Sequence, residues 1–348
     1  MNRRAWIVLV GIGLLLLLSH AAWGQGGYLA NGTLPPLPVP ADNVQTDAKV
    51  RLGAQLYFDT RLSADNTISC ATCHDPRTGW ANPHPTDTGI GGQVGGRNSG
   101  TVINSGYMHF QFWDGREASL EGQAVGPIHN PIEMGETHEN VVRKLNAIAG
   151  YHEQFQAVFG GDATIDAVGK AIAAFERTIV SGPSPFDRYV MGDDSAMSPA
   201  AVRGMHLFNG KAHCTPCHSG PLFSNQGFHN IGVGMDKENP DLGRFDHTKN
   251  AADRGKFKVP TLRNIAETPP YLHDGSEKTL MDVVEYYDRG GIPNPGLDPL
   301  MLPLHLTPRE KSDLVAFLEA LTGPVPQIEV PEFPEGDGVN ADPKGGLR

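Results

Sequence analysis

Apolar residues recur at helical spacing in two stretches of the chain, 166–178 and 308–321. Spacings of three and four residues place side chains on one face of a helix, so both stretches are predicted to be amphipathic helices. The residues that carry the pattern are Val168, Ile172 and Phe175 in the first stretch and Leu314, Phe317 and Leu321 in the second. No convincing strand pattern accompanies them. The chain is therefore predicted to be all-α.

The first residues have the pattern of a signal peptide. Arg3 and Arg4 precede an apolar run from Ala5 to Leu18, and Ala22-Trp-Gly24 supplies a small-x-small pattern. The run is shorter than the roughly 20 residues that a membrane-spanning helix needs. We therefore expect residues 1–24 to be a cleaved signal peptide rather than an anchor. The mature protein is then exported, with no membrane span.

A repeat divides the remaining chain into two halves. Thr101-Val-Ile-Asn104 matches Thr261-Leu-Arg-Asn264, and Asp114-Gly115 matches Asp274-Gly275, each pair 160 positions apart. Such constant spacing is typical of an internal duplication. A Ser-Gly-Pro-Ser-Pro stretch is the predicted linker between the halves. The predicted order is a Pro-rich linker at 25–44, domains at 45–185 and 186–324, and a disordered tail at 325–348.

All four cysteines lie in two copies of one motif, Cys70-Ala-Thr-Cys73-His74 and Cys214-Thr-Pro-Cys217-His218. C-x-x-C-H is the attachment signature of c-type heme. Two thiols on one helical turn reach the two vinyl groups of one porphyrin, and the next residue presents an imidazole to the iron. A redox dithiol or a zinc site would not explain a histidine after both pairs. We predict two covalent hemes in two loop-rich, cytochrome c-like domains.

Composition and charge narrow the functional classes. With 348 residues, 39% of them hydrophobic and 19% charged, the chain suits two globular domains. Its 42 glycines and 28 prolines predict much loop. The net charge of -11 argues against nucleic-acid binding, because no basic stripe could neutralise phosphates.

The two halves differ where a heme domain supplies its sixth iron ligand. The first half has His109-Phe-Gln-Phe-Trp113 there, and the second has Pro269-Pro-Tyr-Leu-His273. A six-coordinate heme moves electrons, whereas an open heme can bind peroxide. The difference predicts a division of labour between the two hemes.

Several segments resemble the bacterial diheme cytochrome c peroxidase family, including its MauG-type enzymes. The resemblance covers roughly residues 45–325. Besides the two heme motifs, it rests on Leu52–Ser63, Phe112-Trp-Asp-Gly-Arg116, Gln123–Pro127, Glu133-Met134, Phe228–Gly232, Thr261–Asn264 and Pro-Tyr-x-His273-x-Gly.

The resemblance implies a role for each matching residue. The first heme, with His74 as its proximal ligand, would react with peroxide, and the second, with His218, would accept electrons from outside. Glu133 matches the distal acid–base carboxylate, and Gln123 borders the same pocket. Trp113 matches the tryptophan that relays electrons between the hemes.

Further matches concern the region between the hemes. Asn98 fits one ligand of the calcium ion that the family often binds between its domains. His273 pairs by the repeat with Trp113 and is expected to line the interheme region without binding iron.

Two departures from the family pattern change this picture. The Gly-rich loop 88–97 lacks the histidine that blocks the first heme in many members, and His84 lies earlier. We therefore expect an open first heme that needs no reductive activation. Where a methionine closes the second heme in those peroxidases, this chain has two prolines next to Tyr271. We expect Tyr271 to be the sixth ligand, as a tyrosinate is in MauG-type enzymes, with a methionine, Met281 first, as the alternative.

The resemblance implies a periplasmic peroxidase that reduces hydrogen peroxide to water with electrons from a small cytochrome c or cupredoxin. A MauG-like oxidase stays open, which would oxidise side chains of a partner protein through a highly oxidised diheme state. A non-catalytic diheme electron carrier is the third reading, and Glu133 counts against it. Related peroxidases are often dimers, so the resemblance allows a homodimer.

Overall fold

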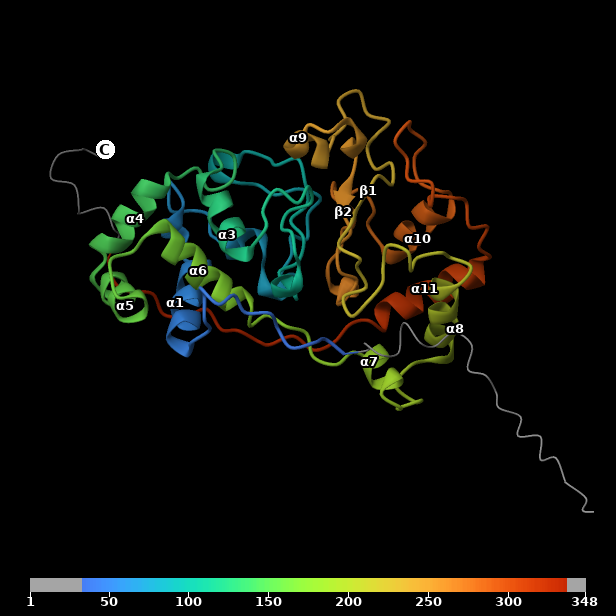
Figure 1. The fold of residues 1–348 in the computed structure, drawn as a ribbon, viewed down its shortest axis with the longest axis horizontal. Helices are drawn as coiled ribbons and strands as arrows, with labels where there is room; N and C mark the ends of the chain where they lie inside the picture. Colours follow the sequence, from blue (N-terminus) through green and yellow to red (C-terminus); the bar gives the residue numbers. More distant parts are fainter. Residues whose placement is uncertain (1–32, 337–348) are drawn as a thin grey trace, which may run out of the picture.

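The computed structural model describes residues 33–336, and helices and loops make up nearly all of that range (Figure 1). The predicted signal peptide and the last residues of the chain lie outside it. The first half contains α1 (Asp47–Phe58), α2 (Cys70–Cys73), α3 (Leu120–His129), α4 (His138–Ala147), α5 (Ala149–Phe159) and α6 (Ile165–Glu176). The second contains α7 (Pro185–Val190), α8 (Pro199–Asn209), β1 (Phe228–His229), α9 (Arg244–Thr248), β2 (Phe257–Lys258), α10 (Leu280–Asp288) and α11 (Pro308–Glu319).

The helix-rich prediction is confirmed. Within the described range, sheet is limited to the short antiparallel pair of β1 and β2. No described helix has the length and apolar character needed to cross a membrane.

A crossing pair of helices organises each half, α1 with α6 and α8 with α11. Gly53 and Gly204 lie where the helices of each pair touch. A Cβ at Gly53 would come within 1.9 Å of the Ala171 carbonyl oxygen, and one at Gly204 within 1.9 Å of that of Asp313. Because only glycine lacks this atom, glycine permits the close approach in both halves.

Each helix pair supports its own hydrophobic core. The apolar residues that predicted helices at 166–178 and 308–321 are buried: Val168, Ile172 and Phe175 on α6, Leu314 and Phe317 on α11, and Leu321 just beyond its end. Full burial of one such side chain contributes about 1.5–3 kcal/mol. The periodic pattern therefore located the two cores correctly.

Matching local conformations recur in the two halves. Asn104 and Asn264 both adopt positive φ, at 63° and 58°. Short antiparallel bridges join Gln111 to Glu117 in the first half and Tyr271 to Glu277 in the second. The backbone therefore follows a similar course through the segments that carry the sequence repeat.

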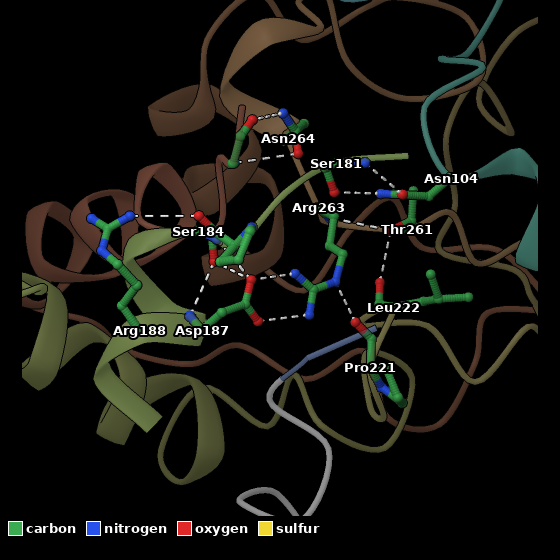
Figure 2. Close-up of polar contacts among 12 residues, drawn as sticks. Asn104, Ser181, Ser184, Asp187, Arg188, Pro221, Leu222, Thr261, Arg263 and Asn264 are labelled. Atoms are coloured by element: carbon green, nitrogen blue, oxygen red, sulfur yellow. Dashed lines mark hydrogen bonds and ion pairs between the residues drawn. The ribbon is translucent and has the colours of Figure 1, made fainter. Parts of the chain in front are cut away.

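Extended segments cross between the halves along one edge of the molecule (Figure 1). They are residues 33–46, the linker at 177–184 and the stretch 322–336. The Gly182 nitrogen donates to the Pro324 carbonyl at 2.7 Å. Asn104 donates from Nδ2 to Ser181 Oγ at 2.9 Å, which fixes the linker to the first half (Figure 2).

The described part of the tail that was expected to be disordered, residues 325–336, contacts the first half. Val325 and Ile328 pack against the core of the first half. Arg61 Nη1 donates to the Pro334 carbonyl at 3.0 Å, and Gln55 Nε2 to the Glu332 carbonyl at 2.8 Å. Proline-rich, acidic composition suggested disorder, but these residues find apolar and polar partners on the other half of the chain.

Candidate heme-binding cavity

Both Cys-x-x-Cys-His motifs line one cavity of about 630 Å³, which lies between the two halves. All four cysteines are free thiols. Burial raises the pKa of Cys70 and Cys214 to about 12 and that of Cys217 to about 11. The structure thus brings the predicted attachment residues of the two halves to a common space.

The first motif is held by a capped turn of helix. Ser69 and Thr72 form a capping box at the start of α2, and His74 follows the helix. The Nδ1 atom of His74 lies 2.9 Å from the Gly100 carbonyl oxygen. Because a carbonyl only accepts, Nδ1 carries the proton and Nε2 keeps its lone pair. Burial lowers the pKa of His74, which keeps the ring neutral.

The second motif reaches the same chemistry with different partners. The Nδ1 atom of His218 lies 2.8 Å from the Phe223 carbonyl oxygen, so Nε2 again keeps its lone pair. Burial lowers the pKa of His218 to about 4. A neutral imidazole with Nδ1–H held by a carbonyl is the usual state of a metal-binding histidine. The free thiol pairs and these imidazoles fit a c-type heme at each motif.

Glu133 lines the cavity with one carboxylate oxygen engaged and one free. Asn130 donates from Nδ2 to Glu133 Oε1 at 2.7 Å. Oε2 makes no hydrogen bond to any residue of the described range. Burial raises the pKa of Glu133, Arg116 opposes the shift, and the carboxylate of Asp87 adds to it. This carboxyl group holds a proton more readily than one at the surface.

The Gly-rich loop fixes the backbone of Glu133. The Ile90 nitrogen donates to the Glu133 carbonyl at 2.8 Å. A Cβ at Gly89 would lie 2.1 Å from the Ile132 carbonyl oxygen, so glycine is required at this contact. Gly89 and Gln123 both line the cavity, whereas His84 does not.

Trp113 lies at the contact between the halves. Its Nε1 donates to the Asn98 carbonyl at 2.8 Å, and its own carbonyl accepts from the Lys258 nitrogen at 2.7 Å. Its ring meets that of His273 edge-on, with centroids 6.4 Å apart. Lys258 and His273 belong to the second half, so the indole contacts both halves and lines the cavity.

Arg116 and Asp87 also line the cavity, although the sequence assigned them no role. The Arg116 guanidinium lies 3.5 Å from the centroid of the Phe112 ring and 2.9 Å from Asp114 Oδ2. Arg116 belongs to the Phe112–Arg116 segment that resembles the family, and this resemblance was the only indication in the sequence that Arg116 could matter. Asp87 accepts from Ser99 Oγ at 2.6 Å, and nothing in its sequence context distinguished it.

Two tyrosines and a methionine line the cavity near the second motif. The hydroxyl of Tyr271 donates to the Ile265 carbonyl at 3.1 Å, and burial raises the pKa of Tyr271 to about 12. Tyr287 hydroxyl makes no hydrogen bond to a described residue, and burial beside Cys214 and Cys217 raises its pKa. Met281, the alternative sixth ligand expected from the sequence, does not line the cavity, whereas Met301 does. The sequence missed Tyr287 because only its place in helix α10 turns it toward the cavity.

Asn98 contacts the second half through its backbone and its own half through its side chain. Its nitrogen donates to the His273 carbonyl at 2.8 Å, and its Nδ2 to the His84 carbonyl at 2.8 Å. Within residues 33–336, no group of three or more His, Cys, Asp or Glu side chains is arranged to hold a metal ion. Calcium at Asn98 stays a prediction.

Several known proteins are similar to this chain. A family model described as di-haem cytochrome c peroxidase matches residues 47–195. The cytochrome-c peroxidase IdrP1 of Denitromonas iodatirespirans is 39% identical and covers 91% of this chain and 93% of its own. The methylamine utilization protein MauG of Methylorubrum extorquens is 42% identical, with 86% and 85% covered. A crystal structure of a MauG-like protein associated with microbial copper homeostasis is 33% identical, has a TM-score of 0.76, and covers 83% and 93%.

Proposed function

Because this chain belongs to the di-haem cytochrome c peroxidase family, we propose that it is a periplasmic enzyme that reduces hydrogen peroxide to water. Two electrons and two protons convert each peroxide into two waters. The electrons would come from a small redox protein, a cytochrome c or a cupredoxin. The predicted signal peptide at 1–24 supports export.

Two hemes accompany membership of this family, and we propose that both are covalently attached. The pairs Cys70/Cys73 and Cys214/Cys217 would form the thioether bonds, with His74 and His218 as proximal ligands. We also propose that the halves arose by duplication. The matching turns and bridges around Asn104 and Asn264 support this origin.

The free oxygen of Glu133 is the observation that carries the proposed reaction. When bound, the first heme would supply an iron that holds peroxide and exchanges electrons with it. Glu133 Oε2 would take the proton from the inner oxygen of peroxide and return it to the outer oxygen, so that water leaves. Asn130 holds the other oxygen at 2.7 Å, which fixes the direction of the free one. A general acid–base group needs this reach and a pKa suited to both transfers.

Neighbouring side chains would assist Glu133. Arg116 and Gln123 offer N–H donors on the same cavity wall. The Arg116 charge opposes the burial that raises the pKa of Glu133, so the carboxyl can both accept and release a proton. Donors of this kind stabilise negative charge that develops on oxygen.

Trp113 would carry electrons between the two halves. Its indole lines the cavity and meets His273 at 6.4 Å between centroids. A π-system at the contact between the halves offers a stepping point that an aliphatic side chain would not. The second heme would receive electrons first and share them with the first through this residue.

A tyrosine would close the second heme, and the contacts favour Tyr287 over the expected Tyr271. The hydroxyl of Tyr271 already donates to the Ile265 carbonyl. The hydroxyl of Tyr287 has no such partner in the described range, and its pKa responds to both cysteines of the second motif. A tyrosine ligand is also the feature that favours the second candidate, a MauG-like oxidase acting on a partner protein.

The resting enzyme and its turnover test these proposals. We expect one high-spin and one low-spin ferric signal by electron paramagnetic resonance, together with steady-state oxidation of reduced cytochrome c by peroxide. Two low-spin signals would remove the open first heme. The expected spin states without oxidation of any small donor would favour the MauG-like reaction. A homodimer and calcium at Asn98 remain proposals for size-exclusion and metal analysis.

A further inference from the structure

Three successive carbonyl groups near the second motif are each held by a different partner. The Pro221 carbonyl accepts from Arg263 Nε, and the Leu222 carbonyl accepts from Thr261 Oγ1 at 2.8 Å. The Phe223 carbonyl accepts from His218 Nδ1 at 2.8 Å. Figure 2 shows the first two of these contacts. The loop 221–223 is thus fixed on one side by residues 261–263 and on the other by the proximal histidine.

The Arg263 guanidinium is itself anchored by helix α7, which directly follows the linker. Nη1 and Nη2 of Arg263 donate to Asp187 Oδ2 and Oδ1 at 2.8 and 2.9 Å (Figure 2). The two side chains are only 1% and 2% exposed. Ser184 also donates to Asp187 Oδ2, from its nitrogen at 2.8 Å and from Oγ at 2.9 Å. A buried ion pair is tolerated when its hydrogen bonds are satisfied, as they are here.

Phe223 has no freedom to adjust if this support is lost. It adopts φ of 51°, a conformation that non-glycine residues rarely take. Its ring packs against Phe186 at 5.1 Å, Phe317 at 6.1 Å and Phe208 at 6.2 Å between centroids. Such a backbone persists only when its surroundings over-determine it. Movement of Pro221 or Leu222 therefore transfers to the carbonyl that His218 contacts.

The first half repeats the threonine contact but has no charged residue at the position that matches Arg263. His74 Nδ1 also meets a carbonyl, that of Gly100. The residue 160 positions before Arg263 is Ile103, which carries no charge. Thr101 Oγ1 donates to the Gly79 carbonyl at 2.7 Å, and the next residue after Gly79, Trp80, also has positive φ, at 56°. Among the described residues, the threonine–carbonyl contact therefore recurs in the first half, whereas the position that matches Arg263 holds no partner for such an ion pair.

We propose that the Asp187–Arg263 ion pair positions the proximal histidine of the second heme, His218, and ties the linker between the halves to that heme. The inference rests on the proposed role of His218 as an iron ligand. A hydrogen bond from Nδ1 to a carbonyl makes the imidazole more electron-donating and favours ferric iron. Loss of the support weakens this bond and raises the reduction potential of the second heme alone.

The test uses the holoprotein with both hemes attached and the variants Arg263→Lys and Thr261→Val. Lysine keeps the charge, but it lacks the planar guanidinium that lets Arg263 donate to Asp187 and to the Pro221 carbonyl at the same time. Thr261→Val removes only the hydroxyl contact to the Leu222 carbonyl. Arg177→Lys is the matched control, because Arg177 forms a buried two-pronged pair with Glu121 in the first half. Spectroelectrochemical titration gives the potential of each heme, and thermal unfolding reports stability.

At a fixed ambient potential, we expect about a tenfold rise in the reduced-to-oxidised ratio of the second heme in Arg263→Lys, with the first heme unchanged. Thr261→Val shifts the same heme in the same direction by less, and Arg177→Lys shifts neither. An unchanged second heme in folded Arg263→Lys, or equal shifts of both hemes, overturns the proposal. If Arg263→Lys does not fold, the presence or absence of the shift in Thr261→Val decides. Potentials are measured without peroxide, so a wild type that lacks turnover would sink the proposed function separately.

Discussion

Asn130 and Glu133 form a hydrogen bond of 2.7 Å in which the amide occupies one carboxylate oxygen of this cavity-lining residue and leaves the other without a hydrogen bond in the described range. The two residues lie on the same turn, which follows α3 directly. Substitutions of the two residues therefore test two different properties of the Glu133 carboxyl group, its ability to transfer protons and its pKa. Removing the carboxylate tests whether it transfers protons, and removing the amide tests how its pKa is set.

Replacing Glu133 with glutamine is expected to lower kcat/KM for peroxide by about 10²–10⁴-fold, the usual contribution of a positioned acid–base group. The side chain keeps its size, so both hemes should remain attached. Peroxide-dependent oxidation of reduced cytochrome c measures the effect. Glu139→Gln, a change in the first turn of α4, is the control and should retain wild-type turnover. Full activity in Glu133→Gln would remove the residue from the mechanism.

The acid limb of the pH profile should report the pKa of Glu133. Peroxide must give its proton to the ionised carboxylate, so activity falls as the pH drops through that pKa. Burial raises the pKa, and the Asn130 hydrogen bond lowers it by stabilising the ionised form. Asn130→Leu should therefore move the acid limb of kcat/KM to higher pH. A limb that stays in place, or moves to lower pH, contradicts this assignment.

Replacing Tyr287 with phenylalanine should change the absorption and electron paramagnetic resonance spectra of the second heme. The hydroxyl lines the cavity without a protein partner in the described range, so it is available to the iron. Tyr271→Phe is the natural comparison, because its hydroxyl is engaged by Ile265. A changed spectrum in Tyr271→Phe alone would return the ligand role to Tyr271. If neither variant changes the spectra, Met301 becomes the candidate for the sixth ligand of the second heme.

Replacing Gly53 or Gly204 with alanine should destabilise the fold. The added Cβ would meet a carbonyl oxygen at 1.9 Å in each case, so the crossing helices must separate. Overpacking of this kind costs about 1–3 kcal/mol, and more where the backbone cannot shift. Thermal or urea unfolding measures the loss. Gly161→Ala has nothing within 4 Å of its new atom and should change stability little.

Residues with a local signature could be predicted from the sequence, and residues that act through tertiary contact could not. The spacing of Cys70, Cys73 and His74 predicts heme attachment whatever the fold. The period of Val168, Ile172 and Phe175 likewise specifies a buried helix face. Tyr287 lacked such a signal, because a tyrosine in a helix is as often a core residue as a ligand.

The same distinction applies to the tail and to Arg263. Composition indicates whether a segment can fold by itself, and residues 325–336 are stabilised instead by a distant surface. Arg263 was read as part of a repeated Thr-x-x-Asn segment. Its importance comes from Asp187 and Pro221, which are 76 and 42 positions away in the chain.

Residues 325–336 return to the first half. The two halves are therefore joined by two chain segments, the linker and this returning segment, rather than by the linker alone. The chain leaves the first half through the linker, builds the second, and comes back to contact Gln55 and Arg61. The first half is therefore not complete in one continuous stretch. A fragment ending near residue 185 would lack the tail residues that pack on the first half. A rotation of one half about the linker would have to break the contacts of the returning segment. In the proposed diheme enzyme, the linker and the returning segment would together hold the two heme sites at a fixed separation, as electron transfer between them requires.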